Sequence, residues 1–327
     1  MTVATTFAPY RTTSDLARML ALASRCWRTM GPDAQVHPGN LCWRLGRVDP
    51  AARAHNVGLW TWGGDLLGFA VIHQQAPADL LLDPEWIDQP GLFRLMVNWV
   101  CQRIHELSGA AVTGTGPGLG CLLNSTDRAR MLEGMGFRPG IRCYQRMLME
   151  PLNRTAMGAE AAQDSLRFSA SRHAMDAWLV LYRRVFPHSP LTDAGLRRIH
   201  ASPRYLPRLS RIALDADRRP IAFVVAWLDP ASESVELEPV GCDPLWRRRG
   251  LTRALVHDAL SRAAAQGATR ASLTTRSDDY GAIRFYERCG FRPYALEREF
   301  MPPSTQTPDS ASLDLSARSR GHLCARR

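Results

Sequence analysis

"CDPLWRRRGLTRALV" (residues 242–256) is the stretch that decides the fold of this chain and the place of its chemistry. Apolar residues recur at three- and four-residue spacing from Leu251 onward, which predicts that a helix begins near Gly250. Three arginines, Arg247, Arg248 and Arg249, stand immediately before it. Cations are unfavourable at a helix N-terminus, where the dipole is positive and the first N–H groups lack acceptors. The arrangement is therefore typical of a site that holds an anion.

The surroundings of this stretch occur twice in the chain. The matched pairs are "GFRP" from Gly136 and Gly290, "GFAV" (68–71) with "AFVV" (222–225), and "DPEW" (83–86) with "DPLW" (243–246). The first two pairs share an offset of 154 residues, and the third has an offset of 160. Three matches in the same order predict two copies of one fold, each of about 150 residues.

Each copy has the same predicted order of helices and strands. Predicted helices cover 14–27 (with Ser14 as N-cap), 91–107, 126–134, 173–186, 250–266 and 279–288; predicted strands cover 57–62, 66–74, 110–114, 210–216, 220–228, 234–242 and 270–275, with two closing strands in each copy. This order predicts an α+β fold with a mixed sheet in each copy. The expected domains are 1–150 and 166–301, joined by a small, polar linker at 151–165 and followed by a disordered tail at 302–327.

Composition excludes few classes of protein. The formal net charge is +10, and every one of the 41 basic residues is arginine, which codon bias or an affinity for phosphates would each explain. The arginines are scattered, without an aromatic-basic stripe, so we expect no nucleic-acid partner. None of the eight cysteines forms a C-x-x-C pair, which argues against a zinc cluster. No apolar run is long enough for a membrane span and no signal peptide is evident, so we expect a cytoplasmic protein without a membrane partner.

Two motifs in the second copy carry a resemblance to a known family. The pattern R/Q-x-x-G-x-G/A appears as "RRRGLT" (247–252), and the pattern N-x-x-A-I-x-x-Y-x-x-x-G-F appears as "DYGAIRFYERCGF" (279–291). Together with the order of elements, they resemble the GNAT superfamily of N-acetyltransferases. The likeness covers 166–301 well and 1–150 faintly, through the repeat, and the arrangement is similar to mycothiol-synthase-type tandem GNAT proteins. It implies an acetyl-CoA-dependent enzyme that transfers an acetyl group directly to an amine, with no metal.

The resemblance also implies which residues bind acetyl-CoA. Main-chain N–H groups at the helix start would hold the pyrophosphate, because Gly250 has no Cβ to keep the phosphate away. The end of strand 234–242 would pair with the pantetheine amides. The implied cofactor-binding residues are Val240, Gly241, Cys242, Arg247, Arg248, Arg249, Gly250, Leu251, Thr252, Arg253 and Asp279. The sequence departs from the family pattern at Thr252, which replaces a Gly or Ala, and at Asp279, which replaces an Asn.

Three residues are candidates for proton transfer. Glu236 and Glu238 share one face of the predicted strand, and either one can be the general base that takes a proton from the amine. The alternative for both is a solvent-facing position. Tyr286 stands where the family has the phenol that protonates the leaving thiolate, and its alternative role is packing. Cys242 and Cys289 are interpreted as core thiols, since no adjacent base marks either one as a nucleophile.

The first copy lacks these features. By the offsets, Pro90 stands against Gly250 and Leu132 against Tyr286. We therefore expect that this copy does not bind acetyl-CoA productively, and that it shapes the acceptor site or acts as a built-in dimer partner. The acceptor is expected to be a small-molecule amine, and the protein a monomeric pseudo-dimer or a weak homodimer. A non-catalytic acyl-CoA sensor, a protein or peptide N-acetyltransferase and a nucleic-acid-associated protein remain as alternatives.

Overall fold

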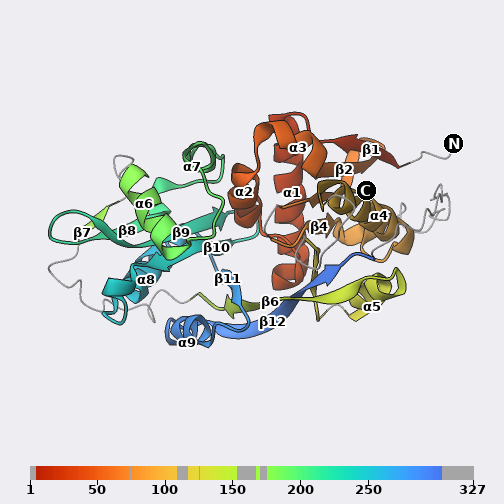
Figure 1. Cartoon of the computed structure of the whole chain (residues 1–327). Helices are drawn as coiled ribbons and strands as arrows, with labels where there is room; N and C mark the ends of the chain where they lie inside the picture. Colours follow the sequence, from red (N-terminus) through yellow and green to blue (C-terminus); the bar gives the residue numbers. More distant parts are fainter. Residues whose placement is uncertain are drawn as a thin grey trace, which may run out of the picture.

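The computed structural model describes residues 5–73, 76–108, 117–124, 126–152, 167–169 and 175–303, and it has two halves that each contain strands covered by helices (Figure 1). The predicted strand at 110–114 lies outside the described residues. So do 153–165 of the predicted linker and 304–327 of the predicted tail.

The N-terminal half follows the predicted order with additional elements. It contains β1 (Thr6–Pro9), α1 (Thr13–Met30), α2 (Pro38–Arg47), α3 (Pro50–Asn56), β2 (Val57–Trp62), β3 (Asp65–Val71), β4 (Asp79–Leu82), α4 (Pro90–Ser108), β5 (Leu119–Leu122), α5 (Thr126–Gly134) and β6 (Arg138–Met149). The prediction that Ser14 is the N-cap of α1 is wrong. Thr12 caps this helix, because the carboxylate of Asp15 reaches back to accept from the Thr12 N–H at 3.0 Å.

The C-terminal half has the matching series of elements. It contains β7 (Arg167–Ser169), α6 (Met175–Val185), α7 (Asp193–His200), β8 (Arg211–Leu214), β9 (Pro220–Asp229), β10 (Ser234–Cys242), α8 (Leu251–Ala264), β11 (Arg270–Arg276), α9 (Tyr280–Arg288) and β12 (Arg292–Met301). The prediction of two closing strands in each copy is wrong. Within the described residues each half closes with one long strand, β6 or β12, because irregularities in their pairing let a single strand bend without a turn.

The closing strands are exchanged between the halves. One sheet has the order β1-β2-β3-β4, and the other has the order β5-β12-β6-β11-β10-β9-β8-β7. A parallel bridge between Ala78 and Leu119 connects the two sheets. Strand β6 thus lies between β11 and β12, and β12 lies between β5 and β6, so each half is completed by a strand of the other (Figure 1). This arrangement is that of a strand-exchanged dimer within one chain.

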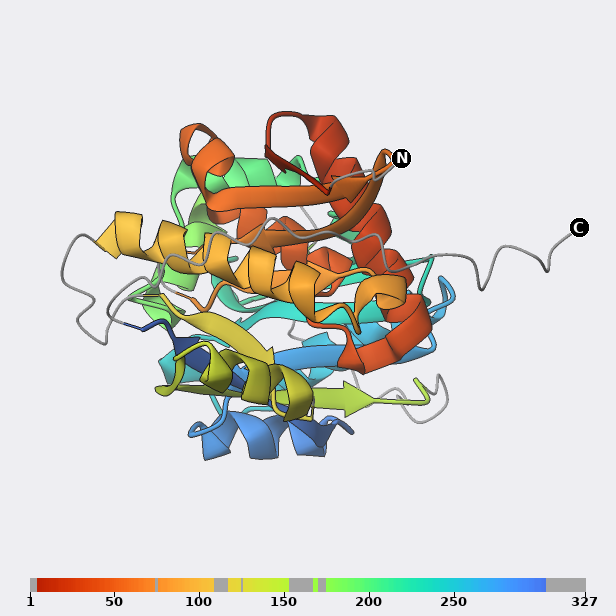
Figure 2. The same ribbon diagram turned by 90° about the vertical axis from the view of Figure 1, so that its right-hand side faces the viewer.

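Helices cover both faces of the strands, which explains the continuous apolar run at 221–228. Phe223, Val225 and Trp227 of β9 belong to a core shared with α1, α2 and α6, whereas alternate residues of β9 pack in a second core with α8. A third core lies under α4, which crosses in front of its strands in Figure 2. Among the described helices, none has the length and apolar content needed to cross a lipid bilayer.

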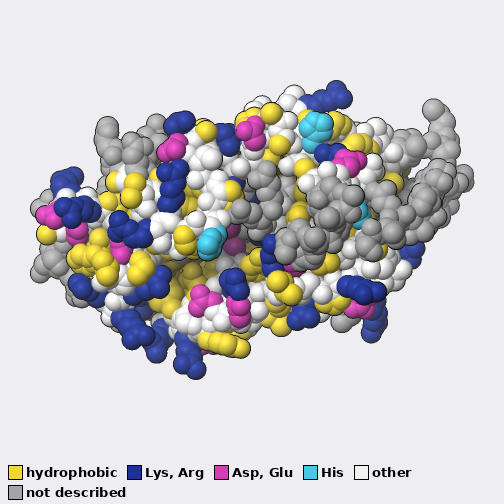
Figure 3. Space-filling view, in the orientation of Figure 1, with side chains coloured by type: hydrophobic (Ala, Val, Ile, Leu, Met, Phe, Trp, Pro, Cys, Tyr) yellow, Lys and Arg dark blue, Asp and Glu magenta, His cyan; other side chains and the backbone are white. Residues whose placement is uncertain are grey.

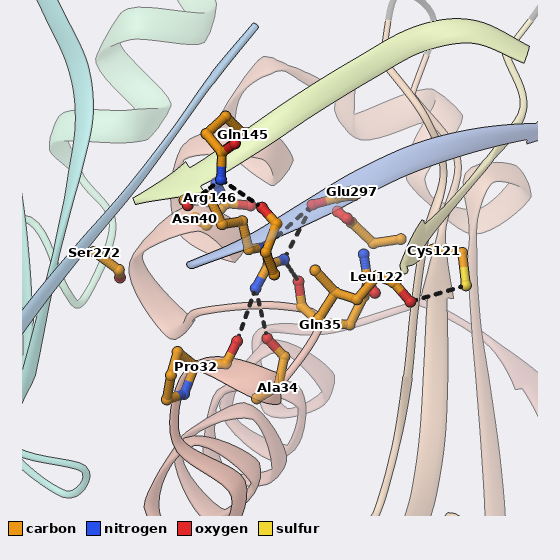
Figure 4. A network of polar contacts seen from close by, with 12 residues as sticks. Pro32, Ala34, Gln35, Asn40, Cys121, Leu122, Gln145, Arg146, Ser272 and Glu297 are labelled. Carbon is orange, nitrogen blue, oxygen red and sulfur yellow. Dashed lines mark hydrogen bonds and ion pairs between the residues drawn. The ribbon is translucent and has the colours of Figure 1, made fainter. Parts of the chain in front are cut away.

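Arg146 on β6 connects the central strands to the segment between α1 and α2 (Figure 4). Its guanidinium donates to the carbonyl oxygens of Ala34 (2.8 Å), Pro32 (3.4 Å) and Gln35. It also forms an ion pair with Glu297 of β12 at 3.1 Å, and the two side chains are 12% and 4% exposed. A buried carboxylate needs such a partner, so Arg146 fixes the N-terminal helices against the exchanged strands.

We expect Arg146→Ala to lower the free energy of unfolding by about 3–5 kcal/mol, because it leaves the Glu297 carboxylate buried without a partner. The measurement is urea denaturation. The control Arg130→Ala removes an exposed pair with Asp127, and it should change the free energy of unfolding by less than about 1 kcal/mol. The double variant Arg146→Met/Glu297→Met should recover part of the loss. Equal losses of stability in Arg146→Ala and Arg130→Ala would contradict the role assigned to Arg146.

Candidate active site

The predicted anion site lies at the start of α8. Gly250 is the N-cap residue with φ 78°, and a Cβ at this position would meet no heavy atom of the protein within 4 Å. The hydrogen-bond ladder of α8 begins with the Ala254 N–H donating to the Gly250 carbonyl at 3.0 Å. The N–H groups immediately before it therefore lie outside the ladder, as at any helix start. This combination of open space and helix N-terminus suits a phosphate group.

The predicted arginines surround this helix start. Arg247, Arg248 and Arg249 are exposed, and Arg248 has a positive φ of 63°. The guanidinium of Arg249 lies 4.6 Å from the centre of the Trp246 ring, which restricts its position. Three cations in solvent add a positive potential at a site whose main-chain dipoles already favour anions.

Strand β10 separates from β11 after a short stretch of pairing. The two strands pair in parallel only through Ser234, Val235 and Glu236, whereas β10 remains paired with β9 as far as Cys242. Within the described part of the chain, the other edge of β10 has no strand partner over 237–242, where Val240, Gly241 and Cys242 lie. An open strand edge of this kind can pair with an extended ligand.

Cys242 is the last residue of β10. Its thiol donates to the Asp243 carbonyl at 3.5 Å, and burial raises the pKa of the thiol. Burial likewise raises the pKa of Cys289 to about 12. Both residues are thus neutral thiols at physiological pH, in agreement with their interpretation as structural residues. Gly241 is required for packing, since a Cβ there would lie 2.5 Å from the Phe223 ring.

Glu236 is buried at the point where β10 and β11 part. It is 4% exposed and accepts a hydrogen bond from the Ser272 hydroxyl of β11. Burial, together with the nearby charge of Glu238, raises the pKa of this carboxyl to about 7 against the opposing effect of the Ser272 hydrogen bond. The expected alternative, a solvent-facing position on an antiparallel strand, is wrong for Glu236.

Glu238 lies two residues further along β10, beyond the last residue paired with β11. Its carboxylate accepts from the Asn40 side chain of α2, and its main-chain oxygen accepts from the Trp227 indole N–H at 2.6 Å. Burial raises the pKa of the carboxyl, while the charges of Arg44 and Arg47 lower it. A raised pKa makes this carboxyl a stronger proton acceptor than an ordinary glutamate, as a general base requires.

Tyr286 on α9 is 9% exposed, with the rings of Phe285 and Phe291 at 5.0 and 6.1 Å. Burial raises the pKa of its phenol, and the negative charge of Glu238 contributes, so the hydroxyl stays protonated and can act as a donor. Asp279 is the N-cap of α9, and its carboxylate accepts from the Ala282 N–H at 2.9 Å.

A cleft of about 390 Å³ lies between the two halves. Figure 3 shows a hollow near the middle of this face with acidic and basic side chains around it. Glu238, Thr274 and Glu297 line the cleft from the C-terminal strands, and Tyr144 lines it from β6. The N-terminal half contributes Asn40, Arg44, Arg47, Asn56 and His73, and α7 with the residues before it contributes Pro190, Thr192 and Arg198.

Sequence reasoning missed the residues that α2 contributes to this cleft. The signal was present in "HPGNLCWRLGR" (37–47): His37 is the N-cap, Pro38 is at the first helical position, and two arginines recur at three-residue spacing. Arg44 is held by an ion pair with Asp79, which also accepts from His73 at 2.8 Å. The two partners hold the pKa of Asp79 at about 2 against the effect of burial, whereas burial lowers the pKa of His73.

Comparisons with known proteins agree with this geometry. Residues 173–291 match the acetyltransferase (GNAT) family. The chain is 26% identical to mycothiol acetyltransferase of Beutenbergia cavernae over 88% of its own length and 95% of that protein. It is 28% identical to the [ribosomal protein bS18]-alanine N-acetyltransferase of Salmonella typhimurium over 42% of its own length and 88% of that protein.

Solved structures share the whole architecture. A tandem GNAT protein from the clavulanic acid biosynthesis pathway has a TM-score of 0.60 at 14% identity, covering 93% of this chain and 99% of that one. A GCN5-related N-acetyltransferase from Sphaerobacter thermophilus has a TM-score of 0.59 at 17% identity, covering 92% and 98%. Residues 173–291 thus carry the match to the GNAT acetyltransferase family, and the chain as a whole has the tandem arrangement of that fold.

Proposed function

We propose that this protein transfers the acetyl group of acetyl-CoA directly to the amine of a small molecule held in the cleft between the halves. The observation that carries the proposal is the position of Glu238, which lies beyond the β10–β11 pairing and also lines the cleft. Acetyl-CoA would lie along the open edge of β10 with its pyrophosphate at Gly250, and the acceptor would approach from the cleft.

Each proton has an assigned place in the reaction. The amine nitrogen attacks the thioester carbon, so a C–N bond forms and the C–S bond breaks. Glu238 takes a proton from the attacking nitrogen, and the Tyr286 phenol gives one to the departing thiolate. A main-chain N–H on the open edge of β10 would meet the oxyanion. Glu236, buried two residues before Glu238 on β10, is the second candidate for the base.

The N-terminal half supports a small acceptor over a protein substrate. Its helix α2 and its residues Asn56 and His73 form one wall of the cleft. The mycothiol acetyltransferase relative, whose printed name specifies a small molecule, matches along both halves, whereas the ribosomal-protein acetyltransferase matches only 42% of this chain. A cleft enclosed in this way suits a compact ligand more than a chain terminus.

The pyrophosphate site is tested by Gly250→Asp, which would place a carboxylate at the helix start. Affinity for coenzyme A, measured by calorimetry, should fall by about tenfold or more through charge repulsion. Gly267→Asp is the matched control, because Gly267 also has a positive φ (95°), and no heavy atom lies within 4 Å of the position that a Cβ would take. The control should suffer the same backbone strain and keep its affinity. If both variants bind coenzyme A equally well, the site is wrongly placed.

The roles of the carboxylates and the phenol are tested by turnover. With thiol release from acetyl-CoA as the readout and a panel of amines as acceptors, Glu238→Gln should lower kcat by about 100-fold or more, as expected for loss of a general base. Tyr286→Phe should lower kcat without changing affinity for coenzyme A, and Glu236→Gln should have a smaller effect than Glu238→Gln. A larger loss from Glu236→Gln would reverse the assignment. A wild-type protein that binds coenzyme A and releases no thiol would favour the sensor alternative.

Glu236 also makes a prediction about stability. Its pKa is near 4.5 in an unfolded chain and about 7 in the folded protein, so the unfolded state ionises first as pH rises. The free energy of unfolding should therefore fall between pH 4.5 and 7 and then level off, whereas Glu236→Gln lacks this dependence. The difference in free energy of unfolding between Glu236→Gln and the wild type should therefore shift in favour of the variant by about 3 kcal/mol across this pH range. Denaturation curves at pH 5, 6 and 7.5 measure it, and a constant difference would contradict the burial of this carboxyl.

A further inference from the structure

We propose that the acceptor amine carries a carboxylate or phosphate group, and that Arg47 and Arg198 bind this anion in the cleft that Glu238 lines. This inference rests on the proposed function, because it specifies the substrate class of the same site. It is carried by three groups on the cleft wall: a cation without an ionic partner, a second cation in a positive surrounding, and a buried amide oxygen without a donor.

Arg47 is the last residue of α2 and lines the cleft. Within the described residues its side chain has no ion pair or hydrogen bond, and its Nε is buried without a partner. Its contact is with the Trp43 ring, whose centre lies 5.8 Å from the guanidinium. By contrast, Arg44 pairs with Asp79 on the same wall. A partly buried cation without a counter-ion is unfavourable unless a ligand supplies the charge.

Arg198 on α7 adds a second cation to the cleft lining. Its Nε donates to the Gly46 carbonyl at 3.0 Å, which fixes the side chain beside the end of α2. Burial lowers the pKa of this guanidinium, and the charges of Arg53 and Arg197 lower it further, while Asp49 opposes them. The surroundings of Arg198 are thus positive on balance, and a bound anion would relieve the repulsion.

Within the described residues no acidic group of the lining forms an ion pair with either arginine, although Glu238 interacts with Arg47 and Asp49 with Arg198 at longer range. Glu297 is bound to Arg146. Asp49 caps α3 by accepting from the Ala51 N–H at 2.9 Å. Glu238 is held by Asn40, on the same cleft as the arginines, and is assigned to the amine. The cleft therefore presents a carboxylate for a cationic amine and two arginines for an anion, the charge pattern of a zwitterionic ligand.

Asn56 marks the cleft as a polar binding site. Its side chain is 4% exposed, lines the cleft, and has its Oδ1 buried without a partner within the described residues. Its main-chain oxygen accepts from the Ile72 N–H at 2.8 Å, so the residue is fixed in place. Buried amide oxygens are rarely left without a donor in folded proteins, and a hydroxyl or N–H of the acceptor would provide one.

The test compares matched acceptors that differ in the anion. O-phosphoethanolamine is compared with ethanolamine, and 6-aminohexanoate with hexylamine, each by kcat/KM for thiol release from acetyl-CoA. We expect the wild type to prefer the anionic member of at least one pair by about tenfold or more, mainly through KM, as for a charge-assisted hydrogen bond. The pair that is preferred tells phosphate from carboxylate. Arg47→Gln and Arg198→Gln should each reduce the preference by about tenfold.

Arg28→Gln is the control, because Arg28 is an exposed arginine that lies in the N-terminal half, as Arg47 does, but does not line the cleft. It should leave the preference unchanged. Turnover of the neutral amines without any preference for the anionic ones overturns this inference and leaves the proposed function standing. If no amine releases thiol, the proposed function fails. In that case, the affinities for O-phosphoethanolamine and ethanolamine are compared by calorimetry without acetyl-CoA. Tighter binding of O-phosphoethanolamine that is lost in Arg47→Gln supports the inference. Equal affinities for the two ligands overturn it.

Discussion

The exchange of β6 and β12 is the constraint on which the rest of this structure depends. Each strand pairs with its counterpart and also with the sheet of the opposite half, so neither half has a complete sheet by itself. Because backbone hydrogen bonds fix the register of such strands, the two halves have one defined position relative to each other. The Arg146 guanidinium extends this constraint from β6 to the segment before α2. The cleft between the halves is a consequence, since its walls come from elements that the exchanged strands hold together.

The two copies differ in what they contribute to the proposed reaction. The C-terminal copy keeps the helix start with Gly250, the open edge of β10 and the carboxyls of Glu236 and Glu238, which are the elements that the proposed acetyl transfer needs. In the N-terminal copy, α4 begins at a proline, which has no N–H to offer an anion. That copy instead places Asn40, Arg44 and Arg47 against Glu238. In the proposed reaction one copy would thus provide the reacting groups, while the other provides the wall that faces them, with arginines that lower the pKa of the Glu238 carboxyl.

Sequence reasoning was most successful where local patterns determine structure. The runs at 57–62 and 234–242 are strands with the predicted bounds, and helix 126–134 was also placed correctly, because period-2 and period-3.6 patterns reflect burial directly. It did not predict helices at α2 and α7, which are short and partly polar, and it therefore did not identify the residues of α2 that line the cleft. The N-cap of α1 was misplaced by two residues, since Ser14 and Thr12 are both suitable caps and only the Asp15 contact distinguishes them.

By itself, the sequence determined that the chain contains two copies of one fold, and that the motifs of acetyl transfer stand in the second. Those features depend on residues close together along the chain: a glycine and arginines at a helix start, or alternating residues on a strand. Only the tertiary structure decided that the closing strands are exchanged and that Glu238 faces α2 across a cleft. The same holds for the burial that raises the pKa of Glu236 and Glu238. The physical reason is that burial, charge and strand partnership arise between residues far apart along the chain, such as Asn40 and Glu238 at 198 positions, and no local pattern encodes such contacts.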